Sequence, residues 1–228
     1  MKFARADLKT CGESTGVVVA IDVLRAFTTA ACFFAGGVEE IILVSGVDEA
    51  FTLRERFPGS LIAGEIDGIQ VQGFDLGNSP AALTGLDLRG RRIIQRTSAG
   101  TQGVVRAQKA DIILAAALTN ATATIRYIQK LAPPEVTFIL TGYFPEEGWG
   151  DEDAACANVF EALLTGQPFD RQEVTRRVLA SRSGRHYDGT HPSFPLADLD
   201  IVLDFDRFDF AMQVFKENGL FLLRPVSQ

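Results

Sequence analysis

Residues 16–30 carry the sequence Gly-Val-Val-Val-Ala-Ile-Asp-Val-Leu-Arg-Ala-Phe-Thr-Thr-Ala. The unbroken apolar run that ends at Ile21 is typical of a strand buried on both faces, and a helical pattern begins at Leu24. A strand, a turn and a helix are therefore predicted here. Asp22 then lies at the carboxyl end of the strand, which is where open α/β sheets bind their ligands.

The same alternation continues over the first two-thirds of the chain. Apolar runs predict further strands at 40–44, 61–63, 92–95, 111–116 and 136–140. Helical patterns lie between the strands, at 24–35, 48–57, 101–110, 120–131 and 152–164. Strands that alternate with helices predict an α/β fold, here a three-layer sandwich with a largely parallel or mixed central sheet.

The rhythm of the sequence changes after Gly166. A charged helix is predicted at 170–181 and a polar loop at 183–195, followed by a strand, a helix and a strand at 201–203, 208–215 and 220–223. No low-complexity linker and no internal repeat separates this part from the rest. We therefore expect one domain, residues 1–228, with a somewhat distinct C-terminal section from about residue 167.

Composition narrows the class of protein. A chain of 228 residues with 46% hydrophobic content is long enough for one large domain. It contains no apolar run of the roughly eighteen residues that mark a membrane span, and its first residues lack the apolar core of a signal peptide. We expect a cytoplasmic protein with no membrane partner.

Charge and cysteine content exclude further classes. The net charge is −7 and the basic residues are spread along the chain, so we expect no nucleic-acid partner. The three scattered cysteines and two histidines argue against a disulfide framework and against a zinc site. An anionic ligand would need local arginines, backbone donors or a metal in its site.

Residues 64–80 form the loop richest in chemistry, Gly-Glu-Ile-Asp-Gly-Ile-Gln-Val-Gln-Gly-Phe-Asp-Leu-Gly-Asn-Ser-Pro. Glu65 follows a predicted strand, and Asp75 precedes a turn that presents hydrogen-bond donors. Carboxylates beside a glycine-rich turn suit Mg²⁺ together with a phosphate-bearing ligand. The alternative is an ordinary surface loop in which these residues form turns.

Two other strand-to-helix junctions carry suitable residues. Arg25 lies in the first turn of a predicted helix, where the positive end of the helix dipole disfavours a cation. Its position is favourable if it binds an anion together with the helix N-terminus. The alternative is that Asp22 caps the helix and pairs with Arg25. Residues 96–103, Arg-Thr-Ser-Ala-Gly-Thr-Gln-Gly, form either an oxyanion cradle or a helix start capped by Ser98 or Thr101.

Two segments further along the chain leave their role open. The acidic residues of 148–153, Gly-Trp-Gly-Asp-Glu-Asp, are expected at a helix start on dipole grounds, which favours capping over a metal role for Asp151 and Asp153. The locally basic segment 181–186 offers Arg185 and His186. This segment either closes over an anionic substrate or forms a solvated loop.

Four strings of the sequence, in this order, resemble the 2-phosphosulfolactate phosphatase family. They are Val-Ala-Ile-Asp-Val-Leu-Arg-Ala-Phe-Thr-Thr at 19–29, Gly-Glu at 64–65, Gly-Phe-Asp-Leu-Gly-Asn-Ser-Pro at 73–80 and Thr-Ser-Ala-Gly-Thr at 97–101. The resemblance extends to 150–154 and more loosely to 183–185, and so covers most of the chain. Ala99 stands where family members often have Asn in a Thr-Thr-Asn-Gly-Thr string, which leaves the substrate open.

The resemblance implies a phosphoric monoester hydrolase with Mg²⁺ as cofactor and an unusual α/β fold. Its named reaction converts 2-phosphosulfolactate to sulfolactate and phosphate, on the route to coenzyme M. A homo-oligomer is expected on the same ground. The alternatives are a phosphatase of another small phosphorylated hydroxy acid and a non-catalytic protein that binds an anionic metabolite.

The hypothesis places three kinds of residue in one site. The predicted catalytic residues are Asp22, Arg25 and Glu65. The predicted Mg²⁺ ligands are Asp22, Glu65 and Asp75, with Asp22 or Glu65 as a general base in the alternative. The predicted substrate-binding residues are Asn78, Ser79, Thr97, Ser98, Gly100, Thr101 and Arg185. No covalent nucleophile is evident, so direct attack by water is expected.

Overall fold

The computed structural model describes residues 1–142, 144, 146 and 150–226. The strands in chain order are β1 (Lys2–Ala6), β2 (Val17–Ile21), β3 (Glu40–Val44), β4 (Leu61–Ile66), β5 (Ile69–Gln70), β6 (Arg92–Arg96), β7 (Ile112–Ala116), β8 (Glu135–Leu140), β9 (Ala211–Glu217) and β10 (Leu220–Val226). The α-helices in chain order are α1 (Ala26–Ala35), α2 (Val47–Arg56), α3 (Gly100–Arg106), α4 (Ala121–Leu131), α5 (Asp151–Thr165), α6 (Arg171–Ala180) and α7 (Ala197–Val202).

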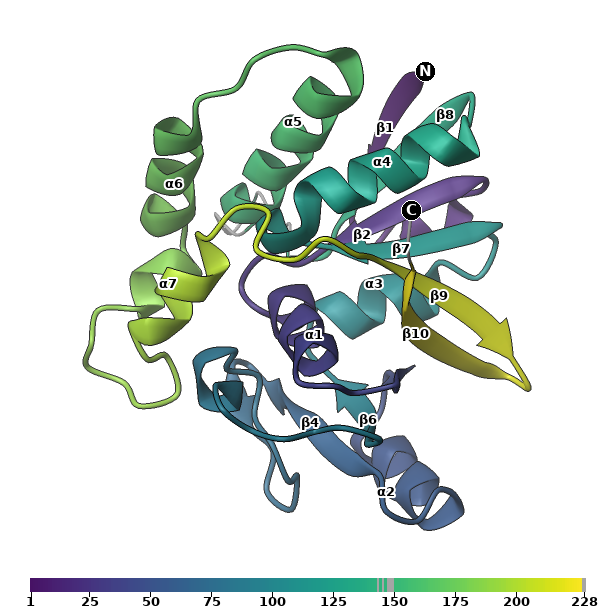
Figure 1. The fold of residues 1–228 in the computed structure, drawn as a ribbon, viewed down its shortest axis with the longest axis vertical. Coiled ribbons are helices and arrows are strands. Elements are labelled where there is room, and N and C mark those ends of the chain that lie inside the picture. Colours follow the sequence, from purple (N-terminus) through teal and green to yellow (C-terminus); the bar gives the residue numbers. More distant parts are fainter. Residues whose placement is uncertain (143, 145, 147–149, 227–228) are drawn as a thin grey trace.

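The ten strands form one mixed sheet in the order β1-β8-β2-β7-β9-β10-β3-β6-β4-β5 (Figure 1). Strands β1, β8, β2 and β7 pair in parallel, and so do β3, β6 and β4. The hairpin of β9 and β10 joins these two blocks through antiparallel pairs on both sides. The predicted α/β fold with a largely parallel or mixed sheet is confirmed.

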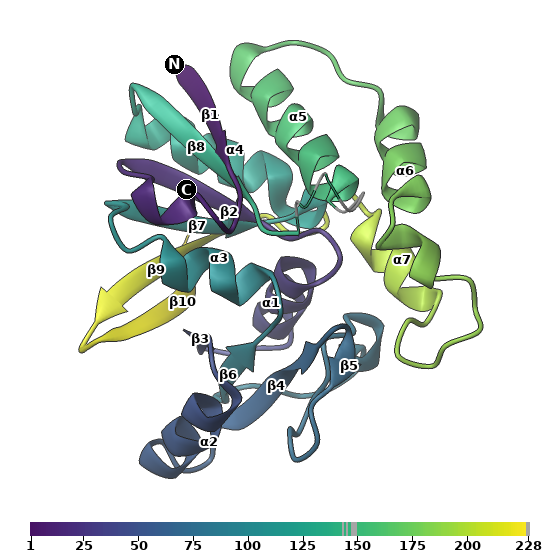
Figure 2. The same cartoon turned by 180° about the vertical axis from the view of Figure 1, so that it is seen from behind.

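The hairpin makes the two parallel blocks run in opposite directions, because three antiparallel pairings separate β7 from β3. Neighbouring strands twist by roughly 20–25° relative to one another. Over the steps from β2 to β6 this twist turns the second block well away from the plane of the first (Figures 1 and 2). The carboxyl ends of both blocks consequently reach one cavity, described below.

Helices cover both faces of the sheet and complete the three layers. Val18 and Ala20 of β2 face a core that includes α1 and α3, whereas Val19 and Ile21 face a core that includes α4 and α5. Helix α2 covers the second block, with Leu53 packed among side chains of β3, β4 and β6. The period-2 alternation of buried side chains explains why β2 is apolar along its whole length.

The C-terminal section contains the two wrong predictions of secondary structure. Residues 201–203, predicted as a strand, lie at the end of α7, and residues 208–215, predicted as a helix, contribute to β9. Asn218 and Gly219 both have positive φ, which is the two-residue hairpin turn that suits the twist of its strands. Because of this turn, β9 and β10 pair with each other and with both blocks of the sheet.

Strand β1 was also not predicted, and it extends the first block by pairing in parallel with β8. None of the helices in the described part of the chain combines the length and the apolar character that a membrane span requires.

Candidate active site

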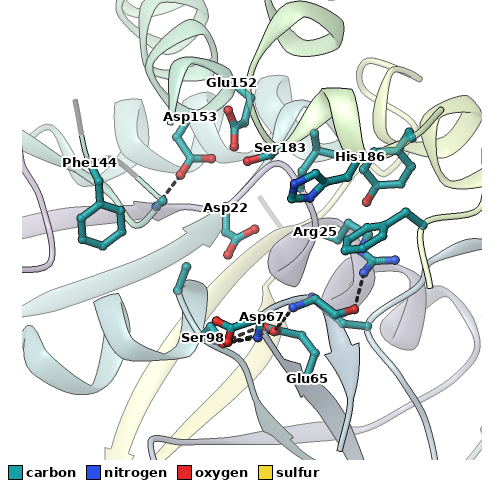
Figure 3. A pocket seen from close by; sticks show the side chains of 17 residues that line it. Asp22, Arg25, Glu65, Asp67, Ser98, Phe144, Glu152, Asp153, Ser183 and His186 are labelled. Atoms are coloured by element: carbon teal, nitrogen blue, oxygen red, sulfur yellow. Dashed lines mark hydrogen bonds between the residues drawn. The ribbon is translucent and has the colours of Figure 1, made fainter. Parts of the chain in front are cut away.

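A cavity of about 540 Å³ lies where the segments after β2, β4, β6 and β8 meet the first turn of α5 and the segment 183–194 (Figure 3). Its described lining contains five carboxylates and one arginine, Arg25. The carboxylates are those of Asp22, Glu65, Asp67, Glu152 and Asp153. The structure thus brings two of the predicted strand-end acids, Asp22 and Glu65, into one site.

Asp22 lies directly after β2 and is 5% exposed. The Ala26 N–H donates to its Oδ1 at 2.8 Å, so Asp22 holds the start of α1, as the capping alternative proposed. The Thr141 hydroxyl lies 3.4 Å from its Oδ2. Burial, followed by the negative charges of Glu65 and Glu152, raises the pKa of Asp22 to about 7. Asp22 therefore changes its charge in the physiological pH range.

Gly100 allows helix α3 to begin in contact with Asp22. A Cβ atom at Gly100 would lie 2.8 Å from the Asp22 Oδ2 and 2.6 Å from the Ala26 Cβ, closer than such atoms approach. The Gly100 N–H also donates a hydrogen bond to Asp22. A side chain at this position would push the helix away from the carboxylate.

The other members of the 97–101 segment hold the loop in place. The Thr97 N–H donates to the Thr101 Oγ1 at 2.9 Å, and the Thr101 N–H donates to the Thr97 Oγ1 at 3.0 Å. Both threonines are buried and do not line the cavity. Only Ser98 and Ala99 of this segment reach the lining, so the predicted cradle is smaller than the sequence indicated.

Glu65, at the end of β4, binds the segments that follow β4 and β6. Its Oε1 accepts the Ser98 N–H at 2.6 Å, and its Oε2 accepts the Gly68 N–H at 2.7 Å and the Ser98 hydroxyl at 3.1 Å. Figure 3 shows these contacts on the wall that carries Ser98 and Asp67. Three donors fix the orientation of this carboxylate.

Arg25 pairs with Asp198 and not with Asp22. The Arg25 Nη1 lies 2.8 Å from the Asp198 Oδ2, and both side chains are buried, at 3% and 0% exposure. The two Nη atoms also donate to the backbone carbonyls of Ser193 and Gly68, at 2.8 and 3.1 Å. Arg25 lines the cavity, but these hydrogen bonds tie its guanidinium to three other segments of the chain.

Asp198 and two aromatic rings complete this arrangement. The Asp198 Oδ1 accepts the Ser79 hydroxyl at 2.6 Å and the Ala81 N–H at 3.0 Å, so Ser79 supports Asp198 and does not line the cavity. The Arg25 guanidinium lies 5.1 Å from the Phe194 ring centre and 5.7 Å from that of Tyr187. No pattern around Asp198 in the sequence indicated this role.

The first turn of α5 contributes two buried acids. Asp153 accepts the Val23 N–H at 3.0 Å and the Gly142 N–H at 2.9 Å, which links α5 to the segments after β2 and β8. Burial, with the charges of Asp22 and Glu152, raises the pKa of Asp153 well above its usual range. Asp153 and Glu152 both line the cavity, a placement that the sequence left open.

Of the other predicted residues, some line the cavity and some lie outside it. Asn78 lines the cavity and is 7% exposed, and its Oδ1 has no hydrogen-bond partner among the described residues. His186 also lines the cavity, whereas Arg185 is exposed and does not. Asp151 pairs with Arg177 away from the lining.

Asp75 lies apart from the other predicted metal ligands. Its Oδ2 accepts the Ile62 N–H at 2.8 Å and lies 3.6 Å from an Arg54 nitrogen. It does not line the cavity. Its carboxylate stabilises the turn of the 64–80 loop against β4, a role that the turn-forming alternative anticipated for this loop.

The donor set of the cavity fits a hard cation in one of its usual coordination modes. Within the described residues, no three His, Cys, Asp or Glu side chains are grouped closely enough to hold a metal by themselves. Mg²⁺ usually takes one or two carboxylates and completes its shell with water and substrate phosphate. Asp22 and Glu65 supply such carboxylates, and a cation near Asp22 would offset both the burial of its charge and the repulsion by Glu65 and Glu152, which together raise its pKa.

The sequence of the chain was compared with known proteins. Residues 3–187 match the family described as 2-phosphosulpholactate phosphatase. The chain belongs to this family. Membership makes the protein a phosphoric monoester hydrolase, and the resemblance that the sequence motifs indicated is confirmed. The matched range contains all five carboxylates of this phosphatase's cavity, whereas Asp198 lies beyond it.

Three relatives are named probable 2-phosphosulfolactate phosphatase. The Bacillus subtilis protein is 32% identical over 203 residues, which cover 88% of this chain and 87% of the relative. The Deinococcus radiodurans protein is 36% identical over 181 residues, or 79% of this chain and 75% of the relative. The Carboxydothermus hydrogenoformans protein is 39% identical over 150 residues, or 66% of this chain and 61% of the relative.

Proposed function

We propose that this phosphatase hydrolyses 2-phosphosulfolactate to sulfolactate and phosphate with Mg²⁺ as cofactor. The family and the names of the relatives support the reaction. The observation that carries the proposal is the charge of the cavity, with five carboxylates and Arg25 in its described lining. A phosphomonoester that also bears acidic groups would be repelled from this lining unless a cation bound with it.

Asp22 and Glu65 are the residues proposed to hold Mg²⁺, and Asp75 is not included because it lies outside the cavity. When bound, the ion neutralises phosphate charge and activates a water molecule. Gly100 and Ala26 orient Asp22 through their N–H groups, and the donors on Glu65 orient that carboxylate. Both carboxylates are therefore held in place before a ligand arrives.

Asn78 and His186 are proposed to bind the substrate. The Asn78 amide faces the cavity without a partner for its Oδ1 in the described part of the chain. Burial and the charge of Arg182 lower the pKa of His186, which favours the neutral imidazole at pH 7. A neutral imidazole donates one hydrogen bond to an acidic group of the substrate. Arg25 is assigned to holding the cavity wall rather than to gripping phosphate.

A second candidate is a phosphatase of another small phosphorylated hydroxy acid. Ala99 favours it, because this small apolar side chain lines the cavity where an amide would offer further hydrogen bonds. The route to coenzyme M, a cytoplasmic location and a homo-oligomeric assembly stay predictions.

Phosphate release from 2-phosphosulfolactate, 2-phospholactate and phosphoglycolate, each with Mg²⁺ and with EDTA, tests the proposal. We expect release that stops in EDTA, returns with Mg²⁺ and is fastest on 2-phosphosulfolactate. Undiminished release in EDTA would rule out the metal. Tight binding with no release under any divalent metal would support the non-catalytic alternative. The variant Ala99→Asn shows whether this position sets the preference among the three substrates.

A further inference from the structure

We propose that Glu152 is a catalytic residue that donates a proton to the alcohol oxygen leaving the phosphorus atom. The inference rests on the phosphatase function proposed above, and it gives a role to a cavity residue that this function does not otherwise use.

Glu152 has the geometry of a group that awaits a partner. It lies in the first turn of α5, across the cavity from Glu65, with the Asp22 side chain between these two residues (Figure 3). Its side chain is 2% exposed, and its Oε2 makes no hydrogen bond to any residue that the structure describes. A buried polar atom without a partner is destabilising, so such atoms in folded proteins call for an explanation. A substrate oxygen in the cavity supplies one.

The surroundings of Glu152 favour a carboxyl that keeps its proton. Asp151 and Asp153 flank it on α5, and Asp22 faces it from the end of β2. The Ser183 and Ser181 hydroxyls hydrogen-bond to it and partly offset the rise in its pKa, and no ion pair to it occurs among the described residues. Burial is the main cause that raises the pKa of Glu152, and the charge of Asp151 adds to it.

The other carboxylates of the cavity are less suited to this step. Both oxygens of Asp153 accept backbone N–H groups, and both oxygens of Glu65 accept donors. Asp22 accepts the Ala26 N–H and is a proposed ligand of the cation. Among the carboxylate oxygens of the described lining, only the Glu152 Oε2 is both buried and without a hydrogen bond.

A water oxygen forms a bond to phosphorus while the bond from phosphorus to the alcohol oxygen breaks, and the electron pair stays on that oxygen. The Glu152 carboxyl transfers its proton there, so a neutral alcohol leaves instead of an alkoxide. The proton that the attacking water loses passes to phosphate or solvent, and Glu152 takes a proton from solvent before the next turnover. Such proton transfer contributes roughly 10²–10⁴-fold to rate.

The test compares two substrates of nearly the same shape, 2-phospholactate and its 3,3,3-trifluoro analogue, whose alcohol is more acidic and leaves with less need for a proton. Glu152→Gln keeps the shape of the side chain but has no proton to transfer. We expect kcat on 2-phospholactate to fall by about 100-fold or more, and kcat on the trifluoro analogue to fall far less. Glu161→Gln, the same change on α5 outside the cavity, should leave both rates unchanged.

The outcomes separate this inference from the function on which it rests. Equal losses on both substrates, or no loss on either, would overturn the role of Glu152 while the phosphatase function stands. A wild-type protein that releases phosphate from no phosphomonoester would overturn both. If Glu152→Gln does not fold, Glu152→Asp retains a proton donor that is one methylene shorter. It should then lose more rate on 2-phospholactate than on the trifluoro analogue, and the reverse order would contradict the proposal.

Discussion

The two walls of the cavity carry the same kind of side chain in different electrostatic surroundings. The anchored wall is lined by Arg25, Glu65 and Ser98 and is supported from behind by Asp198. Glu65 and Asp198 each accept three donors. On the acidic wall, formed by Asp22, Glu152 and Asp153, burial and mutual repulsion raise the pKa values.

The difference shows how one residue type serves structure and chemistry in a single site. A carboxylate that accepts several protein donors is fixed in position, so it can shape the cavity or hold a cation in a set orientation. A buried carboxylate that faces other carboxylates gains more from a cation or a proton, and its charged form costs stability. Substitutions on the two walls should therefore separate stability from activity.

The largest expected effect lies on the anchored wall. Asp198→Asn leaves the Arg25 guanidinium buried without its counter-charge, which should lower the free energy of unfolding by about 3–5 kcal/mol. Urea unfolding at pH 7.5 measures this. Asp204→Asn, which breaks an exposed pair with Arg207, is the matched control and should cost about 1 kcal/mol or less. Equal losses in the free energy of unfolding in the two variants would contradict the structural role assigned to Asp198.

A pH titration of stability sharpens the description of the acidic wall. The pKa of Asp22 is raised from 3.8 to about 7 in the folded protein, so the unfolded chain releases this proton first. Its contribution to stability is therefore fully present below pH 3.8 and is lost as the pH rises towards about 7. Urea unfolding in EDTA across this range should show a shallower decline for Asp22→Asn than for wild type. Superimposable profiles would contradict the assignment.

The smallest effect is expected outside both walls. Asp75→Asn weakens a partly exposed hydrogen bond to the Ile62 N–H and a long contact with Arg54, so it should cost about 1 kcal/mol of stability. Because Asp75 does not line the cavity, kcat/KM should change by about twofold or less. A loss of Mg²⁺ dependence in this variant would show that Asp75 belongs to the metal site.

The sequence was sufficient to predict those residues of the cavity that directly follow a strand. Asp22, Glu65 and Ser98 each follow an apolar run, and the rule that ligands bind at the carboxyl ends of strands located all three. The strand Glu40–Val44 was predicted at its observed bounds. Local pattern carries this information because strand burial and strand ends are local properties.

The parts that the sequence did not reveal depend on distant contacts. Asp198 pairs with a residue 173 positions away, and nothing near it marks that pairing. The role of Glu152 was obscured because acidic residues are expected at any helix start. The Asn218-Gly219 pair is a local signal for the β9–β10 hairpin, because both residues suit a two-residue turn. This signal is incompatible with the helix predicted at 208–215, which was wrong.

The most direct test of the division between the walls measures activity and stability of Asp22→Asn in one preparation. We expect kcat/KM for phosphate release to fall by at least about 100-fold, because an oriented group at the reacting centre is lost. We also expect the free energy of unfolding at pH 8 to equal or exceed that of wild type, because a buried charge is removed. A variant that keeps its activity, or that loses stability as Asp198→Asn does, would contradict the account.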